Sequence, residues 1–170
     1  MYRVYRVYCD GATLYNSSLE SLKIFNPSLE LELNKTGSFQ FTVYPDHPQY
    51  SAIKKLRSII TVYQDDYLIF RGRVLDDEIG RYNEKHVTCE GELAFLLDSI
   101  QRPYDYSGTV SGFLNLLIDN HNAQVEESKW FTVGNVTVTD PNDYIVRSNI
   151  DHVDTCLLYT SPSPRDRQKS

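Results

Sequence analysis

The stretch Leu29–Tyr50, LELELNKTGSFQFTVYPDHPQY, decides the fold. Apolar and polar residues alternate along both of its halves, on either side of the turn residues Lys35-Thr36-Gly37. Alternation with a period of two places apolar side chains on one face of a strand, and a glycine-containing turn between two such runs is typical of a β-hairpin. The pattern therefore predicts strands over 29–34 and 38–44, followed by a corner at 45–50. The side chains predicted to face inward are Leu29, Leu31, Leu33, Phe39, Phe41 and Val43.

Further short strands are predicted on both sides of this hairpin. Residues 3–9 alternate up to an Asp-Gly turn, and residues 58–63 and 67–75 flank Gln64-Asp65-Asp66 as a second hairpin. Gly72 inside the latter predicts a bulge or a close approach of two backbones. Residues 86–90 predict another strand, and 92–99 a short helix. Many short strands with little helix favour a barrel or a sandwich.

A second, mixed unit is predicted after residue 104. Pro103 and the following polar residues read as a linker, and an amphipathic helix follows with Thr109 or Ser107 as its cap. A strand is predicted over 130–139. The chain is thus expected to be mainly β with some α, an α+β arrangement with a β-barrel-like domain at 1–104 and the start of an α+β domain at 105–155. The apolar stripe of the helix comprises Val110, Phe113, Leu114, Leu117, Ile118 and His121.

Composition limits the classes of function. The chain has 170 residues, of which 41% are hydrophobic and 24% charged, as in soluble globular proteins. No apolar run approaches the roughly 20 residues of a membrane span. The three cysteines show no metal-ligand spacing, and a reduced, cytoplasmic site of synthesis is expected. A net charge of −6 without a basic block argues against a surface that grips nucleic acid, but it is compatible with a wall past which DNA slides.

Two clusters contain side chains of the types that bind metal ions or take part in catalysis. Asp76-Asp77-Glu78 lacks the spacing of a calcium loop and is interpreted as a solvated turn. His86 and Cys89 fall on opposite faces of a strand, so with Glu90 they do not form a nucleophile–base set. No zinc-protease, nucleophile-elbow or phosphate-loop motif is present in the sequence. We therefore expect no catalytic, cofactor-binding or metal-binding residue and no enzymatic activity in this chain.

Four other polar residues have structural interpretations. His47 is expected to be a corner residue, and His121 to sit at a helix end, where positive charge is favourable. Arg71 and Arg73 flank Gly72 on one face of a predicted strand. Pairing with nearby acids is one interpretation, and a contact between subunits is the other.

The last fifteen residues, CLLYTSPSPRDRQKS (156–170), differ in character from the rest. A Ser/Pro-rich tail is one interpretation. The string CLLYTSPSPRD also resembles a conceptual translation of a common transposon-based sequencing adapter. We therefore expect 156–170 to be a non-native end of a metagenomic fragment whose natural sequence continues beyond Thr155, and we exclude it from the fold prediction.

Four strings in order resemble one family of proteins. They are ELELNKTGSFQFTVYPDHPQY (30–50), IFRGRVLDDE (69–78), VTCEGELAFLLDS (87–99) and FLNLLIDNHNAQV (113–125). Together they resemble the N-terminal hub region of tail-tip proteins of long-tailed bacteriophages and prophages, the phage minor structural protein or prophage tail endopeptidase family. The resemblance covers roughly residues 4–155.

The resemblance implies a role in assembly. Family members have a barrel domain related to the tail tube, form a ring-like homotrimer in the virion tail, and contact distal tail, tape-measure and fibre proteins while DNA passes without specific binding. Some longer members carry a peptidase or glycan-hydrolase domain, so this chain as the hub portion of a tail-associated enzyme is an alternative. A carbohydrate-binding β-module that uses surface tyrosines and Trp130 is another.

Overall fold

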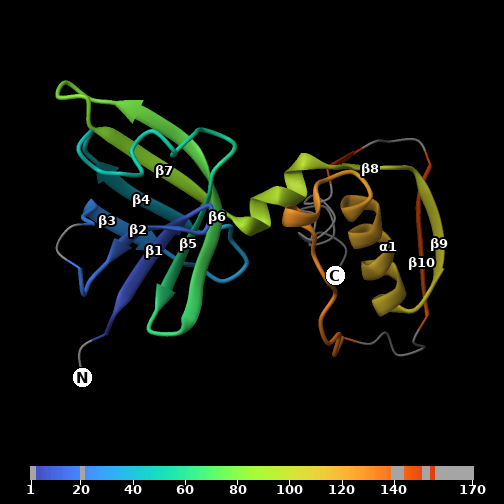
Figure 1. Cartoon of the computed structure of the whole chain (residues 1–170). Coiled ribbons are helices and arrows are strands. Elements are labelled where there is room, and N and C mark those ends of the chain that lie inside the picture. Colours follow the sequence, from blue (N-terminus) through green and yellow to red (C-terminus); the bar gives the residue numbers. More distant parts are fainter. Residues whose placement is uncertain (1–2, 20–21, 139–143, 151–153, 156–170) are drawn as a thin grey trace, which may run out of the picture. The chain divides into compact units, whose positions relative to one another are not determined.

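The computed structural model describes residues 3–19, 22–138, 144–150 and 154–155 (Figure 1). The chain divides into two compact units, Met1–Ala94 and Phe95–Ser170. The domain boundary expected at residue 104 stays a prediction. The segment 156–170, expected to be non-native, lies outside the described residues.

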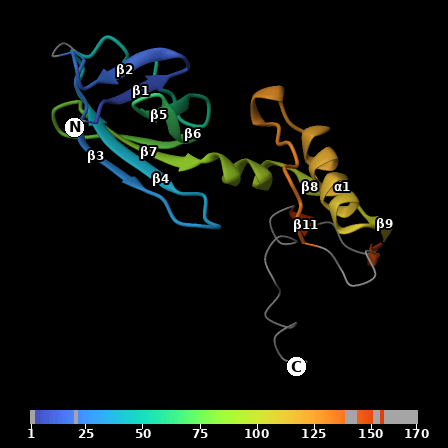
Figure 2. The same ribbon diagram turned by 90° about the horizontal axis from the view of Figure 1, so that it is seen from below.

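The first unit is one antiparallel sheet of seven strands, in the order β2-β1-β5-β6-β7-β4-β3. Figures 1 and 2 show that this sheet is strongly curled. The strands are β1 (Tyr5–Cys9), β2 (Ala12–Asn16), β3 (Phe25–Glu30), β4 (Ser38–Val43), β5 (Ile59–Gln64), β6 (Tyr67–Ile79) and β7 (Lys85–Gly91). The mainly β character and the second predicted hairpin, β5–β6, are confirmed. The first predicted hairpin is confirmed only in part, because within the predicted strand 29–34 only Leu29 and Glu30 pair with β4.

The expectation of a barrel is correct only in part, because the sheet is curled but not closed. Among the described strands, no ladder joins β2 to β3, and these two strands end the sheet. The register of β3 shifts between Phe25 and Ser28, where Asn26 has a φ of 50°. Regular pairing of β3 with β4 therefore covers only residues 28–30.

Apolar side chains on the concave face form the core. Phe39, Phe41 and Val43 are buried, as the alternation predicts. The predicted strand 29–34 is wrong beyond Glu30, because β4 starts only at Ser38 and no neighbouring strand accompanies the residues between them. The other buried members of the core are Val7, Cys9, Leu14, Ile24, Ile53, Ile60, Val62, Phe70, Val74, Val87 and Cys89.

Gly72 marks a close approach of two backbones, as its position in an apolar strand predicts. A Cβ atom at Gly72 would lie 2.1 Å from the carbonyl oxygen of Glu90. Gly91, which pairs with Gly72 across the β6–β7 ladder, has the same constraint, since its Cβ would lie 1.8 Å from the oxygen of Thr36. The bulge in β6 lies further along, between Val74 and Asp76.

The second unit contains the predicted helix as α1 (Val110–Asn122). Thr109 caps it, because its Oγ1 accepts a hydrogen bond of 3.0 Å from the N–H of Gly112. Leu117 is buried together with Leu96, and Phe113 packs against them, which confirms the apolar stripe. The 3₁₀ helix η1 (Glu92–Asp98) contains the division between the two units. The remaining elements of the second unit are the 3₁₀ helix η2 (Glu127–Lys129) and the strands β8 (Ile100–Gln101), β9 (Tyr104–Gly108), β10 (Ile145–Asn149) and β11 (Asp154–Thr155).

Two predictions for this unit are wrong. The predicted linker is the strand β9, which pairs antiparallel with β10. The strand predicted over 130–139 is absent from its described part, 130–138. Asn122 explains part of this difference, because its Nδ2 donates to the oxygen of Phe131 (2.8 Å) and its Oδ1 accepts from the N–H of Phe131 (3.0 Å). The backbone at Phe131 is thus satisfied by a helix side chain rather than by a strand.

Candidate assembly surface

The curled sheet ends in two strands that each have a single neighbour. β2 pairs with β1 and β3 pairs with β4, and within the described residues neither has a partner along its other edge. An unpaired edge presents a row of backbone N–H and C=O groups that can pair with another extended segment. The first unit therefore has two edges that are suited to strand addition.

An apolar cavity of about 490 Å³ lies on the concave side of the sheet and reaches both end strands. Tyr15 of β2 and Leu29 of β3 line it from the two edges. Phe39, Val62 and Ile69 line it from the strands between. The cavity is therefore bounded by hydrophobic side chains and by the two strands with unpaired edges.

Beside this cavity, the residues 31–34 leave the sheet as an exposed segment that we call the leucine arm. Leu31 lines the cavity yet is 58% exposed, and Leu33 is 88% exposed. Glu32 pairs with Lys35 at 2.6 Å on the surface. At the base of the arm, Gly37 has a φ of 72°, and its carbonyl accepts a hydrogen bond from the N–H of Gly91. Beyond Leu31 the segment turns, because the N–H of Lys35 donates to the oxygen of Glu32 at 3.2 Å and Asn34 has a φ of 63°, and Leu33 faces solvent.

Arg71 and Arg73 form ion pairs with acids of their own unit. Arg71 Nη1 lies 2.9 Å from Glu92 Oε2, and Arg73 Nε lies 2.5 Å from Glu90 Oε1. Arg73 and Glu90 are direct partners in the β6–β7 ladder, so their pairing stabilises the contact between these strands. Pairing with nearby acids is confirmed, and a contact of these arginines with another subunit stays a prediction.

The three consecutive acids 76–78 lie in β6 rather than in a turn. Asp76 Oδ1 accepts a hydrogen bond of 2.7 Å from Lys55 Nζ, which lowers the pKa of the Asp76 carboxyl. Asp77 lies 3.8 Å from Lys85 Nζ. Across the described part of the chain, no group of three or more His, Cys, Asp or Glu side chains is placed to hold a metal ion.

His86 and Cys89 lie on opposite faces of β7, as predicted. Cys89 is fully buried in the core, and its burial raises the pKa of its thiol. The side chain of His86 is about half exposed, with its Nδ1 3.0 Å from Thr42 Oγ1. A nucleophile and a base must meet within hydrogen-bonding distance, and these two side chains face opposite sides of the sheet.

His47 is a corner residue, as predicted. It is buried, its Nε2 lies 2.8 Å from the oxygen of Leu14, and its Nδ1 lies 3.0 Å from the N–H of Gln49. This arrangement fits a neutral ring that donates from Nε2 and accepts at Nδ1. The corner after β4 is thereby tied to β2.

His121 lies in the last turn of α1, as predicted, but it is fully buried rather than exposed at the helix end. Its Nδ1 is 2.7 Å from Ser99 Oγ, and its Nε2 is 3.2 Å from the oxygen of Lys129. Both ring nitrogens therefore connect segments of the second unit to the helix.

Lys85 has a structural role that the sequence patterns described above do not indicate. Its Nζ donates to the carbonyl oxygens of Tyr50 and Ile53, both at 3.0 Å, and lies 4.7 Å from the centre of the Tyr50 ring. The residue is 8% exposed. Lys85 occupies an inward position of the alternating strand 85–91. This position indicates a structural role, because a buried lysine requires polar partners.

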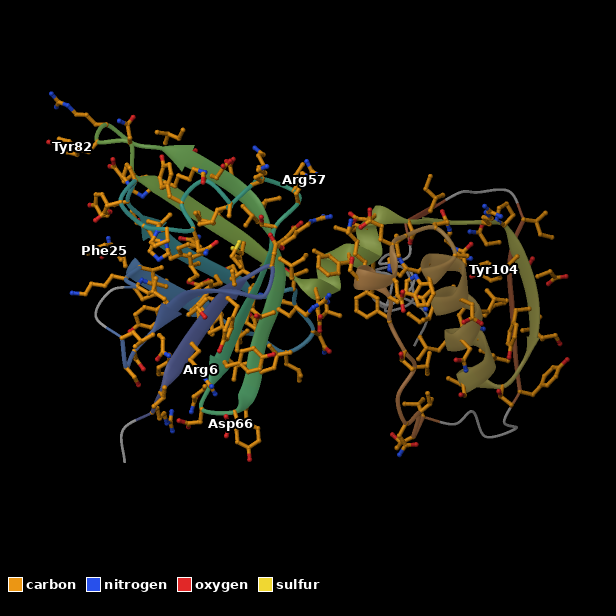
Figure 3. The ribbon with its side chains drawn as sticks, viewed as in Figure 1. Arg6, Phe25, Arg57, Asp66, Tyr82 and Tyr104 are labelled. Carbon is orange, nitrogen blue, oxygen red and sulfur yellow. The ribbon has the colours of Figure 1, made fainter. Side chains whose placement is uncertain are left out.

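A second concave surface lies on the outer side of β1 and β5. Arg6, Tyr8 and Tyr63 line it, with the two tyrosine rings edge to face at 5.7 Å. Arg6 Nη2 donates to Asp66 Oδ1 at 2.8 Å and also to the carbonyl oxygen of Asp65. In Figure 3 the labelled side chains of Arg6 and Asp66 lie close together at one end of the sheet. The charge of Arg6 is therefore already paired within the chain.

Comparisons with known proteins give likenesses to solved structures. No protein-family model and no curated protein sequence matches the chain. Its structure is similar to a 43 kDa tail protein of the prophage MuSo2 from Shewanella oneidensis, with 13% identity, a TM-score of 0.49 and coverage of 71% of this chain and 39% of that one. It is also similar to a chain of the virion of a native gene transfer agent, with 10% identity, a TM-score of 0.38 and coverage of 52% and 39%. This chain thus spans 39% of the length of each of these two proteins.

None of the helices in the described ranges is both long and apolar enough to cross a bilayer.

Proposed function

We propose that this chain is a structural component of a bacteriophage tail tip or baseplate hub, where it helps to close the tail tube and to anchor distal tail parts. The observation that carries the proposal is the order of the four strings at 30–50, 69–78, 87–99 and 113–125, which resembles the hub region of tail-tip proteins. The first string begins at the last residue of β3 and contains β4, and the other three fall on β6, on β7 with η1, and on α1. The proposed location is the virion tail, after synthesis in the host cytoplasm.

The physical requirements of such a part agree with the surface described above. Subunits of a ring can join through unpaired strand edges, and the sheet has two strands with an unpaired edge among the described residues. A channel for DNA needs a wall that does not bind it, and a net charge of −6 repels phosphate. We propose a homotrimer that contacts other tail proteins and has no enzymatic activity of its own.

Immunogold electron microscopy tests the proposal. An antiserum against the chain would be applied to phage particles induced from a bacterial strain that carries the gene, with pre-immune serum as control. We expect gold particles at the tail end distal from the head. Label on the capsid, or intact tailed particles without any label while the protein stays in the cell lysate, would contradict the proposed location.

Sequencing the locus tests the proposal that the chain has no enzymatic part. An open reading frame that ends soon after the codon for Thr155 agrees with a structural protein. A downstream zinc-protease or nucleophile motif in the same frame would instead identify the chain as the hub portion of a tail-associated enzyme.

A further inference from the structure

The outer face of β1 and β5 differs in composition from the inner face of the same two strands. In their antiparallel ladder, Arg6 lies opposite Tyr63. Two residues further along β1, Tyr8 lies opposite Thr61. Successive side chains of a strand point to opposite faces, and Val7, between Arg6 and Tyr8, is buried in the core. The four outward residues therefore share one surface, which is aromatic and polar, while the inner face of these strands is apolar.

The polar end of this surface is held in place by the turn between β5 and β6. Arg6 Nη2 donates to Asp66 Oδ1 at 2.8 Å and to the carbonyl oxygen of Asp65 (Figure 3). Asp65 is joined to the start of β1, because its N–H donates to the oxygen of Val4 at 2.7 Å and its Oδ1 accepts from the N–H of Val4 at 3.0 Å. The guanidinium and the carboxylate are thus oriented before a ligand arrives, which lowers the entropy cost of binding.

The concave surface encloses about 430 Å³, which falls in the range of about 300–1,000 Å³ of small-molecule sites. The rings of Tyr8 and Tyr63 lie edge to face with their centres 5.7 Å apart, so they offer both apolar ring surface and hydroxyl groups. Beyond Tyr8 along the chain, Gly11 also lines the surface, and outside its chain neighbours no atom lies within 4 Å of where its Cβ would be. A ligand longer than one ring can therefore extend past Gly11.

The charges around the concave surface favour a neutral ligand. The carboxylate of Asp66 already lies 2.8 Å from the guanidinium of Arg6, so neither charge requires a counter-ion from the ligand. A carboxylate has about four acceptor positions and a guanidinium has several N–H donors, so both groups keep capacity for further hydrogen bonds. The side chain of Asp66 is 97% exposed, so a ligand can reach it. With the hydroxyl of Thr61, the surface presents donors and acceptors to a hydroxyl-rich molecule.

We propose that this surface binds a neutral saccharide whose pyranose rings have equatorial hydroxyl groups. The axial C–H groups of such a ring form an apolar face that stacks on a tyrosine ring, while its hydroxyls donate to Asp66 and accept from Arg6. A nucleic acid is disfavoured, because its phosphates require unpaired cations and the chain has a net charge of −6. Saccharide binding goes beyond the proposed function and does not depend on it.

NMR titration of the isotope-labelled full chain with cellotriose and with triacetylchitotriose provides the test. Both probes consist of neutral pyranose rings with equatorial substituents. We expect the amides of β1 and β5 to shift, with a dissociation constant on the order of 1 mM for at least one probe, because an open site buries only part of a small ligand. Tyr8→Ala is expected to weaken binding roughly tenfold, because it removes one of the two rings. Tyr67→Ala is the matched control, since Tyr67 starts β6, is 78% exposed and does not line the concave surface.

Asp66→Ala gives a second test, at a residue whose exposure makes a loss of the fold unexpected. The substitution removes an acceptor for sugar hydroxyls and leaves the charge of Arg6 without its carboxylate. We therefore expect the neutral probe to bind roughly tenfold more weakly, and the anionic sugar sialyllactose to bind more tightly than it binds the unaltered chain. Far-ultraviolet circular dichroism and thermal unfolding verify that each variant is folded.

Several results would overturn the proposal. They are the absence of shifts in β1 and β5 at the highest soluble concentration of either probe, shifts confined to the second unit around Trp130, and an affinity for the neutral probe that neither Tyr8→Ala nor Asp66→Ala lowers. Tighter binding of sialyllactose or of a polyproline peptide by the unaltered chain would also refute it, because the ligand would then be an anion or a peptide. None of these results affects the proposed function, which is tested by the position of the gold label.

Discussion

Phe41→Ala is expected to destabilise the seven-stranded sheet strongly, whereas Leu33→Ala is expected to leave its free energy of unfolding almost unchanged. Both residues occupy apolar positions of the same alternating stretch. In the folded chain, Phe41 is 3% exposed and its ring lies 5.2 Å from that of Phe39, but Leu33 is 88% exposed. The pair therefore separates the effect of burial from the effect of sequence pattern.

The expected magnitude for Phe41→Ala follows from the cavity that the substitution leaves. Removing a buried phenylalanine side chain costs about 3–5 kcal/mol. A domain of this size has a total stability of about 5–15 kcal/mol, so the variant loses a large part of it. At about 4–8 °C per kcal/mol, its midpoint of thermal unfolding falls by more than about 10 °C. For Leu33→Ala the change is expected to stay within about 0.5 kcal/mol.

Denaturant unfolding followed by hydrogen exchange and mass spectrometry measures both variants. Peptides from β4 and β7 report the first unit, and the protein is kept at a concentration at which it is monomeric, so that self-association does not contribute. Equal losses for the two variants, or a loss under about 1 kcal/mol for Phe41→Ala, would refute the assignment of the hairpin's inner face.

Three further predictions concern other parts of the chain. Gly72→Ala is expected to unfold the first unit or to shift β6 away from β7, since the new methyl group would lie 2.1 Å from the carbonyl oxygen of Glu90. Heteronuclear NMR of the backbone amides of β6 and β7 would detect either change. An unchanged spectrum would contradict the close approach of the two backbones. Leu117→Asp is expected to destabilise the second unit by about a few kcal/mol, because it buries an unpaired charge. The fluorescence of Trp130 during denaturant unfolding measures this loss. An unchanged midpoint of the unfolding transition would contradict the assignment of the apolar stripe to the core. Burial raises the pKa of the Cys9 thiol to about 11 and that of Cys89 further, so both stay neutral in the folded chain when the unfolded chain ionises near about 8.5. The folded state then binds more protons than the unfolded state, so the free energy of unfolding is expected to fall as pH rises from about 8.5 towards 11. Rapid alkylation of Cys9 or Cys89 in the folded protein at pH 8 would contradict the burial of these thiols.

Local pattern was a good predictor where neighbours along the chain determine the structure. The inward positions Phe39, Phe41 and Val43 follow from alternation, and the helix α1 follows from its apolar stripe and the cap at Thr109. The close approach at Gly72 was also predictable, because a glycine in an apolar strand has few other structural roles.

The predictions that failed depend on contacts between distant residues. Alternation cannot tell whether a strand has a neighbour, so it treats the exposed Leu33 in the same way as the buried Phe41. The segment 130–138 has the composition of a strand, but Asn122 satisfies the backbone at Phe131. Closure of a barrel depends on a ladder between β2 and β3, whose formation no local pattern reports. The candidate assembly surface arises from these same long-range features.

The position of β7 in the sheet determines when the first unit is able to fold. β7 lies between β6 and β4, so it alone connects the β3–β4 hairpin to the other four strands of the sheet. It also contains Lys85, which holds the loop after β4 through a hydrogen bond to Tyr50, 35 residues earlier. A ribosome-bound chain that ends before residue 85 therefore has two strand groups without a ladder between them. Until β7 has left the ribosome, the edges of β6 and β4 that it later covers are unpaired as well, so the nascent chain exposes four strand edges where the described sheet has two.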